Sequence, residues 1–161
     1  MQEDFAARDR FMITLDWLLA LHERYPGNSL DFALLHVCFH DQQRLGQIYG
    51  APEAYHLLAE VGSKLRLAFR RTDLVARDGT DFWILAPYTT PESVIEKIAT
   101  LVAIASADGL NIVDRDVTVF SLPDPTLSEQ APLSSAAAFL AHLKEHRQQA
   151  ACRWAPVMPA K

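Results

Sequence analysis

The sequence has few cysteines and no long hydrophobic run. Its two cysteines, Cys38 and Cys152, are too few for a disulfide-stabilised scaffold, and we expect both to be reduced. No apolar stretch reaches the roughly 18 residues that a membrane-spanning helix needs, so membrane insertion is not expected. The polar N-terminus, M-Q-E-D-F-A-A-R-D-R-F, lacks the apolar centre of a signal peptide. These absences predict a cytoplasmic protein.

Basic residues are in the minority. There are 15 Lys and Arg residues against 20 Asp and Glu residues, and the net charge is −5. Nucleic-acid binding is not expected, because a general nucleic-acid surface needs clustered positive charge. Hydrophobic residues make up 50% of the 161 residues, which permits a packed core and excludes global disorder. The length fits one domain, residues 1–161, with its core at about residues 8–154 and a frayed tail at residues 155–161.

Hydrophobic periodicity and turn residues predict alternating helices and strands. Helical spacing predicts four helices, and short apolar runs predict four strands, two of them joined as a hairpin. The helices are predicted over residues 5–24, 52–70, 91–106 and 132–149, and the strands over residues 32–39, 73–77, 82–86 and 117–122. This order predicts an α/β sandwich (α+β), with helices on both faces of a mixed central sheet of four or five strands.

The predicted hairpin carries a recognisable pattern. Residues 70–87 read R-R-T-D-L-V-A-R-D-G-T-D-F-W-I-L-A-P, so Arg70 and Asp73 form R-x-x-D and G-T-D-F-W follows five residues later. This segment resembles the hairpin of the GGDEF family, the diguanylate cyclase domains, in which G-G-D-E-F occupies the turn. Element order and spacing agree with that family over about residues 8–154. The resemblance implies the nucleotide-cyclase-like GGDEF fold.

The resemblance also implies a degenerate active site. Active members hold GTP with two divalent metal ions, and their two metal-binding Asp positions on the first strand are occupied here by Cys38 and His40. In the turn Gly79 is kept, Thr80 replaces the second glycine, and Asp81 is the acidic residue that remains. Mg²⁺ prefers oxygen ligands, and one carboxylate cannot hold two such ions against a triphosphate. We therefore expect an inactive member of the family, with no Mg²⁺ and no other cofactor.

The inhibitory-type site of the family is retained instead. In family members the Arg of R-x-x-D binds the guanine edge and phosphates of cyclic di-GMP, and the Asp accepts from guanine N–H groups. The resemblance thus implies a regulatory receptor for cyclic di-GMP through Arg70 and Asp73, with Arg71 and Arg77 adding positive charge. The next helix has Lys97 as its one cation and lacks the further Arg that members often carry there. We expect weaker binding for that reason.

Two alternatives remain for these features. Arg70 and Asp73 can be framework residues, with Asp73 capping the start of the hairpin and Arg70 lying at a helix end. The domain can also have lost both sites and serve as a protein-interaction or dimerisation scaffold, either as a homodimer or on a signalling-protein partner.

Histidine and cysteine side chains on the first predicted strand raise two further possibilities. His36, Cys38 and His40 alternate and share one face, so with His56 they have a spacing possible for a soft metal such as zinc. No C-x-x-C or H-E-x-x-H pattern supports a metal site, and packed core side chains are the preferred interpretation. A thiol nucleophile formed by Cys38 with His40 and Asp41 is not supported, because adjacent strand residues face opposite sides.

Overall fold

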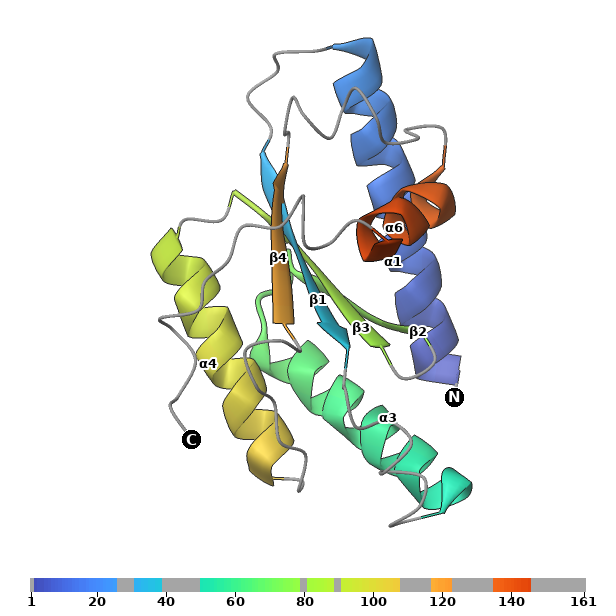
Figure 1. Ribbon diagram of the computed structural model, residues 1–161, viewed down its shortest axis with the longest axis vertical. Helices are drawn as coiled ribbons and strands as arrows, with labels where there is room; N and C mark the ends of the chain where they lie inside the picture. Colours follow the sequence, from blue (N-terminus) through green and yellow to red (C-terminus); the bar gives the residue numbers. More distant parts are fainter. Residues whose placement is uncertain are drawn as a thin grey trace.

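The chain folds as helices packed on a central sheet. A computed structural model describes residues 2–25, 31–38, 50–78, 81–88, 91–107, 117–122 and 135–145. Its helices are α1 (Gln2–Arg24), α3 (Ala51–Ala68), α4 (Pro91–Ala107) and α6 (Ala136–Glu145), and its strands are β1 (Phe32–Cys38), β2 (Leu74–Asp78), β3 (Asp81–Pro87) and β4 (Val117–Leu122) (Figure 1). None of the described helices is long and apolar enough to cross a membrane. The predicted α+β class is confirmed.

The sheet has the strand order β2-β3-β1-β4, and each of its three neighbouring pairs is antiparallel. The prediction of a mixed sheet is therefore wrong for the described strands. The helical crossovers explain the difference. The β1–α3–β2 and β3–α4–β4 connections each join strands that run in the same direction, but β3 lies between β1 and β2, and β1 lies between β3 and β4. Parallel strands are thus never neighbours in this sheet.

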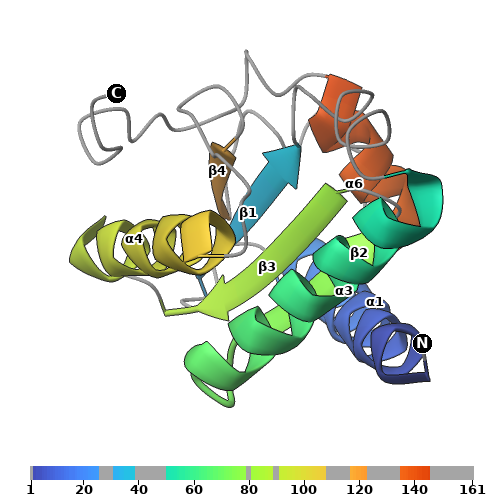
Figure 2. The ribbon, with the colours of Figure 1, turned by 90° about the horizontal axis from the view of Figure 1, so that it is seen from below.

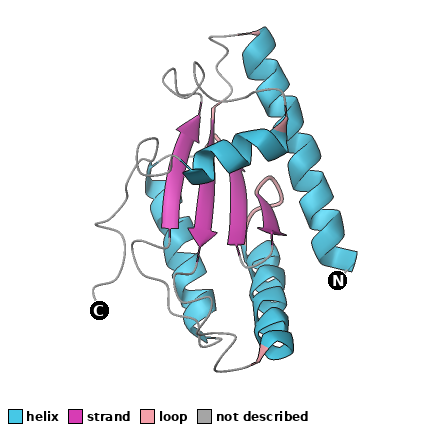
Figure 3. Cartoon of the chain, turned by 45° about the vertical axis from the view of Figure 1, so that its right-hand side comes forward, coloured by secondary structure: helices cyan, strands magenta, loops and turns pink. Residues whose placement is uncertain are grey.

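Each face of the sheet is covered by a pair of helices. Alternation along β1 sends Phe32 and Leu34 into the core beneath α1 and α6, and sends Leu35 and Val37 into the core beneath α3 and α4. Figure 3 shows α6 lying across one face with α3 and α4 behind the strands, and Figure 2 shows α3 and α4 together on their side. The result is a three-layer arrangement with one hydrophobic core on each side of the sheet.

Local sequence explains how α3 delivers the chain to β2. Gly50 has φ of 78°, a left-handed conformation in which glycine carries no steric penalty, and it leads into α3 with Pro52 in the first turn. The helix ends at Ala68, because Phe69 adopts an extended conformation while its N–H still donates to the Leu65 carbonyl at 3.0 Å. This exit places residues 70–73 at the turn between α3 and β2.

The predicted elements agree with the described ones to within a few residues where both can be compared. The strand predicted over residues 117–122 coincides with β4, and the hairpin strands end one residue later than predicted. The last predicted helix contains α6, and its predicted ends at 132–134 and 146–149 lie outside the described residues. The predicted frayed tail, residues 155–161, also lies outside them.

Candidate functional site

The C-terminal end of β1 lies beside the turn end of the β2–β3 hairpin. In the register of β1 and β3 the Cα of Cys38 is paired with that of Asp81, and in the hairpin Asp78 is paired with Asp81. Cys38 and Asp81, two positions at which the resemblance implies an active site, are therefore adjacent. The side chain of Cys38 and the predicted site residues His40, Gly79 and Thr80 lie outside the described part of the chain.

Asp81 is the centre of a charge cluster at this edge. Its Oδ2 atom lies 3.3 Å from Nε2 of His36 and 2.7 Å from Nζ of Lys144. These partners come from β1 and α6, so the cluster joins three elements that are distant in sequence. His36 is fully buried and stacks on Trp83 with 4.3 Å between ring centroids. The carboxylate is therefore held in place from two sides.

The environment of Asp81 keeps it ionised. Burial on its own raises the pKa of the carboxyl group, but hydrogen bonding and charge from His36 and Lys144 outweigh that effect and lower the pKa to about 2. The side chain of Asp81 is only 7% exposed. A buried anion of this kind needs a compensating cation, and Lys144 supplies one.

The divalent ions that the resemblance implies for active family members do not fit these residues. Asp81 already has a cationic partner in Lys144, and Cys38 and His40 offer sulfur and nitrogen where Mg²⁺ needs oxygen. The soft-metal alternative gains no support either. His36 packs on the α1/α6 face while His56 is exposed on α3, and the described residues contain no group of three His, Cys, Asp or Glu side chains that could hold a metal.

The R-x-x-D motif forms a closed turn between α3 and β2. The Arg70 N–H donates to Oδ2 of Asp73 at 3.2 Å, and the Asp73 N–H donates back to the Arg70 carbonyl at 2.9 Å. Such reciprocal bonds are typical of Asp in turns, where its side chain replaces a backbone acceptor. The structure thus brings the two predicted motif residues together, and Asp73 fixes the conformation of the turn.

Lys97 on the neighbouring helix α4 contacts this turn. Its Nζ atom forms a buried ion pair with Oδ2 of Asp73, and the two side chains are 8% and 3% exposed. Lys97 also lies over the ring of Phe69, 5.4 Å from its centroid. The Oδ2 atom of Asp73 is therefore already engaged within the protein.

The arginines predicted to bind a ligand fall into two groups. Arg70 and Arg71 are exposed at the turn, and neither guanidinium is paired with a described residue. Arg77, by contrast, lies near the other end of β2, is 7% exposed, and packs over the ring of Tyr55 at 4.2 Å. The structure therefore groups Arg70 and Arg71 with Asp73 and leaves Arg77 in a packing role against α3.

Two site residues were missed as partners in the sequence analysis. Lys97 was noted only as a cation, although its position between Val94 and Leu101 on the apolar face of the helix signals a buried charge that needs a partner. Lys144 lies at the edge of the buried face of α6 that contains Leu140 and Leu143. Its contact with Asp81 depends on how α6 packs against the sheet, and no local sequence pattern indicates it.

Comparison with known proteins finds likeness in structure alone. The sequence matches no protein-family profile, and no curated protein matches it either. Solved structures do match. The GGDEF domain of YfiN (TpbB) from Pseudomonas aeruginosa is 19% identical, with a TM-score of 0.59 over 89% of this chain and 91% of that one. The GGDEF domain of DgcB from Caulobacter crescentus, solved in complex with cyclic di-GMP, is 14% identical, with a TM-score of 0.61 over 88% and 84%.

A third match is a larger protein. Diguanylate cyclase SiaD of Pseudomonas aeruginosa, solved in complex with its activator SiaC, is 19% identical, with a TM-score of 0.55 over 87% of this chain and 55% of that one. These identities are too low to carry function, and the TM-scores of 0.55 to 0.61 show a likeness in fold. The chain therefore has the nucleotide-cyclase-like fold of the GGDEF domains.

Proposed function

We propose that this protein is a non-catalytic regulatory domain that binds cyclic di-GMP at the turn between α3 and β2. One observation carries the proposal. The turn holds two exposed guanidinium groups, those of Arg70 and Arg71, on a backbone fixed by Asp73. Guanidinium groups match phosphate oxygens in a planar, bidentate geometry, and a cyclic dinucleotide carries two phosphates. The solved complex of DgcB with cyclic di-GMP supports the choice of ligand for this fold.

In this proposal Arg70 and Asp73 have different tasks. Asp73 is buried and bonded to Lys97 and to the Arg70 backbone, so it acts as a positioning residue. Arg70 contacts the ligand, and Arg71 adds a second cation beside it. The ligand thus loses one carboxylate contact that the family resemblance implies. Losing one charge-assisted contact weakens binding by roughly tenfold to a hundredfold, so we expect micromolar rather than tighter affinity.

The absence of catalysis forms the second half of the proposal. It is supported by the pairing of Asp81 with Lys144 and by the donor chemistry of Cys38 and His40 at the neighbouring positions. A protein that condenses two GTP molecules would need oxygen ligands there for its metal ions. We therefore expect no cyclic di-GMP after incubation with GTP and either Mg²⁺ or Mn²⁺, assayed by chromatography. Turnover of GTP to cyclic di-GMP would refute this half.

Calorimetry tests the binding half directly. The purified chain is titrated with cyclic di-GMP, with GTP plus Mg²⁺ as the comparison ligand. Arg70→Ala should reduce the affinity by at least tenfold, and Arg71→Ala should reduce it by less, while the folded state stays intact because both side chains are exposed. Arg10→Ala, an exposed arginine on α1, is the matched control and should bind like the wild type. Absence of heat up to about millimolar ligand contradicts the proposal.

A protein-interaction scaffold is the second candidate, and a different surface favours it. Helix α1 exposes Ile13 at 69% and Trp17 at 59%, and these side chains are four residues apart on its outer face. The solved complex of SiaD with its activator shows that protein bound to a protein partner. If cyclic di-GMP does not bind, the mass of the chain in solution becomes the next measurement. A dimer that dissociates in the Ile13→Ser, Trp17→Ser double variant would support the scaffold.

A further inference from the structure

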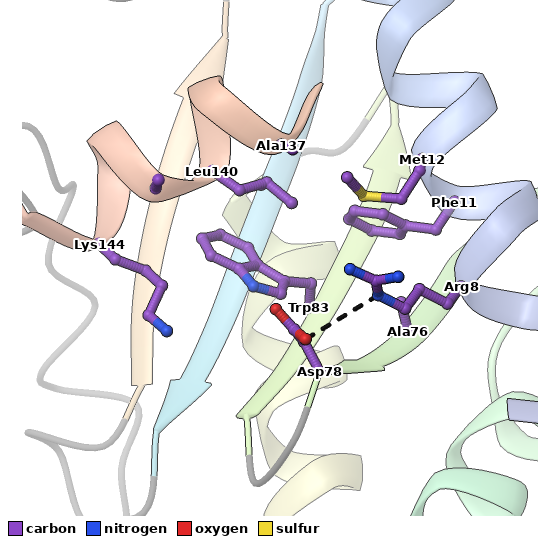
Figure 4. A pocket seen from close by; sticks show the side chains of 10 residues that line it. Arg8, Phe11, Met12, Ala76, Asp78, Trp83, Ala137, Leu140 and Lys144 are labelled. Atoms are coloured by element: carbon purple, nitrogen blue, oxygen red, sulfur yellow. Dashed lines mark ion pairs between the residues drawn. The ribbon is translucent and has the colours of Figure 1, made fainter. Parts of the chain in front are cut away.

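A cavity lies between α1, α6 and the β2–β3 hairpin, on the face of the sheet opposite α3 and α4. Its volume is about 170 Å³ (Figure 4). Seven of its ten lining residues are apolar, and the floor includes Phe11, Trp83 and Leu140, which are at most 7% exposed. The three smallest of the seven are alanines, at positions 76, 137 and 141. Ala76 is buried, whereas Ala137 and Ala141 are exposed, so these small side chains leave room above the apolar floor where the cavity meets the surface.

Charged side chains surround this apolar floor. The other three lining residues are Arg8, Asp78 and Lys144, whose side chains are 45%, 56% and 43% exposed. Figure 4 shows Arg8 on one side of Trp83 and Lys144 on the other, with Asp78 below. Lys144 is already paired with Asp81, so Arg8 is the rim cation that faces an incoming anionic group. An apolar ligand with an anionic end would match both parts of the cavity.

Arg8 is the rim residue whose N–H groups can donate hydrogen bonds to a ligand. Its one described ion pair is with Asp78, where Nε and Oδ1 are 3.9 Å apart, beyond hydrogen-bond distance. Lys144, in contrast, is held by Asp81 at 2.7 Å. The planar guanidinium of Arg8 can therefore bind a carboxylate through two parallel N–H donors.

We propose that this cavity binds a small carboxylate that carries one aromatic ring. The ring occupies the apolar floor beside Trp83, Phe11 and Leu140, and the carboxylate lies at the rim on Arg8. The size supports a single ring, because an apolar cavity of about 150 Å³ is known to hold benzene. The site is separate from the turn that carries Arg70, and it shares Lys144 with the charge cluster of Asp81.

Phenylacetate is the probe, titrated into the full chain by calorimetry and followed in two-dimensional amide spectra. We expect a dissociation constant below about 1 mM and shifts centred on α1, α6 and the hairpin. Arg8→Gln should weaken binding by at least tenfold. Arg10→Gln, two residues further along the same helix and not lining the cavity, is the matched control and should bind like the wild type.

Two further measurements test separately how the aromatic ring and the carboxylate of the ligand contribute to binding. Ala141→Phe places a ring in the cavity from an exposed position on α6 and should abolish binding. The thermal midpoint of Ala141→Phe is measured to check that this variant folds. If it does not fold, Arg8→Gln is the variant that tests the proposal. Phenylacetamide has the same ring without the charge and should bind at least tenfold more weakly. The proposal is overturned if phenylacetate does not bind at a ligand concentration of about 10 mM. It is also overturned if Arg10→Gln weakens binding as much as Arg8→Gln does, or if phenylacetamide binds as tightly as phenylacetate.

The outcome is independent of the cyclic di-GMP proposal. Arg8→Gln should leave cyclic di-GMP binding unchanged, and Arg70→Ala should leave phenylacetate binding unchanged. Loss of both ligands in one variant that still folds would show that the two sites are not separate and would overturn the proposal as stated. If the wild-type chain binds one of the two ligands and not the other, the ligand that does not bind identifies which proposal fails.

Discussion

The Nε2 atom of the fully buried His36 lies 3.3 Å from Oδ2 of Asp81, and the same carboxylate oxygen is 2.7 Å from Nζ of Lys144. This relationship joins β1, β3 and α6 at the edge where the resemblance to GGDEF domains places an active site. The carboxylate that remains there is thus part of an internal ion-pair network. The contribution of this network to stability can be measured as the pH dependence of the free energy of unfolding.

The pKa of Asp81, lowered from 3.8 to about 2, makes the stability of the fold depend on pH in the acid range. Because the folded state holds the proton more weakly than the unfolded state, the contribution is complete above about pH 4 and is lost as pH falls toward 2. We expect a loss of about 2 kcal/mol in the free energy of unfolding over that range, measured by urea denaturation.

The Asp81→Asn variant supplies the comparison for this prediction. It removes the titrating group, so its stability should fall less steeply than that of the wild type between pH 4 and pH 2. Asp9→Asn, which removes one exposed carboxylate from α1, is the control for the change in net charge. Equal slopes for wild type and Asp81→Asn would show that Asp81 is not responsible for the acid dependence.

The buried pair of Asp73 and Lys97 should be costly to break. Lys97→Met leaves the Asp73 carboxylate buried without its cation, and we expect a loss of about 3 kcal/mol or more in the free energy of unfolding. Combining Lys97→Met with Asp73→Asn removes both charges and should restore part of that loss. A double-mutant cycle by urea denaturation measures the coupling. Strictly additive effects would contradict a direct pair.

Sequence reasoning succeeded where the deciding interactions are local. The R-x-x-D spacing groups Arg70 with Asp73, and the two residues share one turn in the structure. The strand predicted over residues 117–122 coincides with β4. Helical periodicity likewise predicted the helix over residues 5–24, which matches α1 to within three residues, and its buried face contains Phe11 and Leu15. Trp17 lies on the opposite, exposed face of α1.

What sequence reasoning missed depends on contacts between distant segments. Strand patterns do not say which strands are neighbours, so the insertion of β3 between β1 and β2 was not predicted. The Lys97–Asp73 pair bridges 24 residues, and no local pattern indicates that Lys97 engages Oδ2 of Asp73. Arg77 was assigned to the ligand site from its charge alone, whereas strand alternation sends it to the α3 face beside Tyr55.

Arg77 and Arg71 should respond differently to substitution, since only one of them is buried. Arg77→Ala removes the contact of its guanidinium with the Tyr55 ring and the packing of its stem, and we expect a loss of about 1–2 kcal/mol in stability. Arg71→Ala should change stability by no more than about 0.5 kcal/mol. Thermal and urea denaturation of both variants test this contrast. A larger effect at Arg71 than at Arg77 would reverse their assigned roles.

Helix α6 depends on a cap from a distant helix. The backbone N–H of Ala136 donates to Oδ1 of Asp16 on α1, and the N–H of Ala138 donates to Oγ of Ser135 at 3.1 Å. Removing a side-chain cap typically costs about 1 kcal/mol, so Asp16→Ala should destabilise the protein by that amount and increase amide exchange in α6. Asp9→Ala on the same helix should have little effect, because Asp9 is exposed and caps none of the described helices. Hydrogen exchange resolved along the chain makes the test specific, since a general loss of stability would speed exchange in α1 and α6 alike. Unchanged exchange in α6 would mean that Ser135 alone is sufficient to hold its first turn.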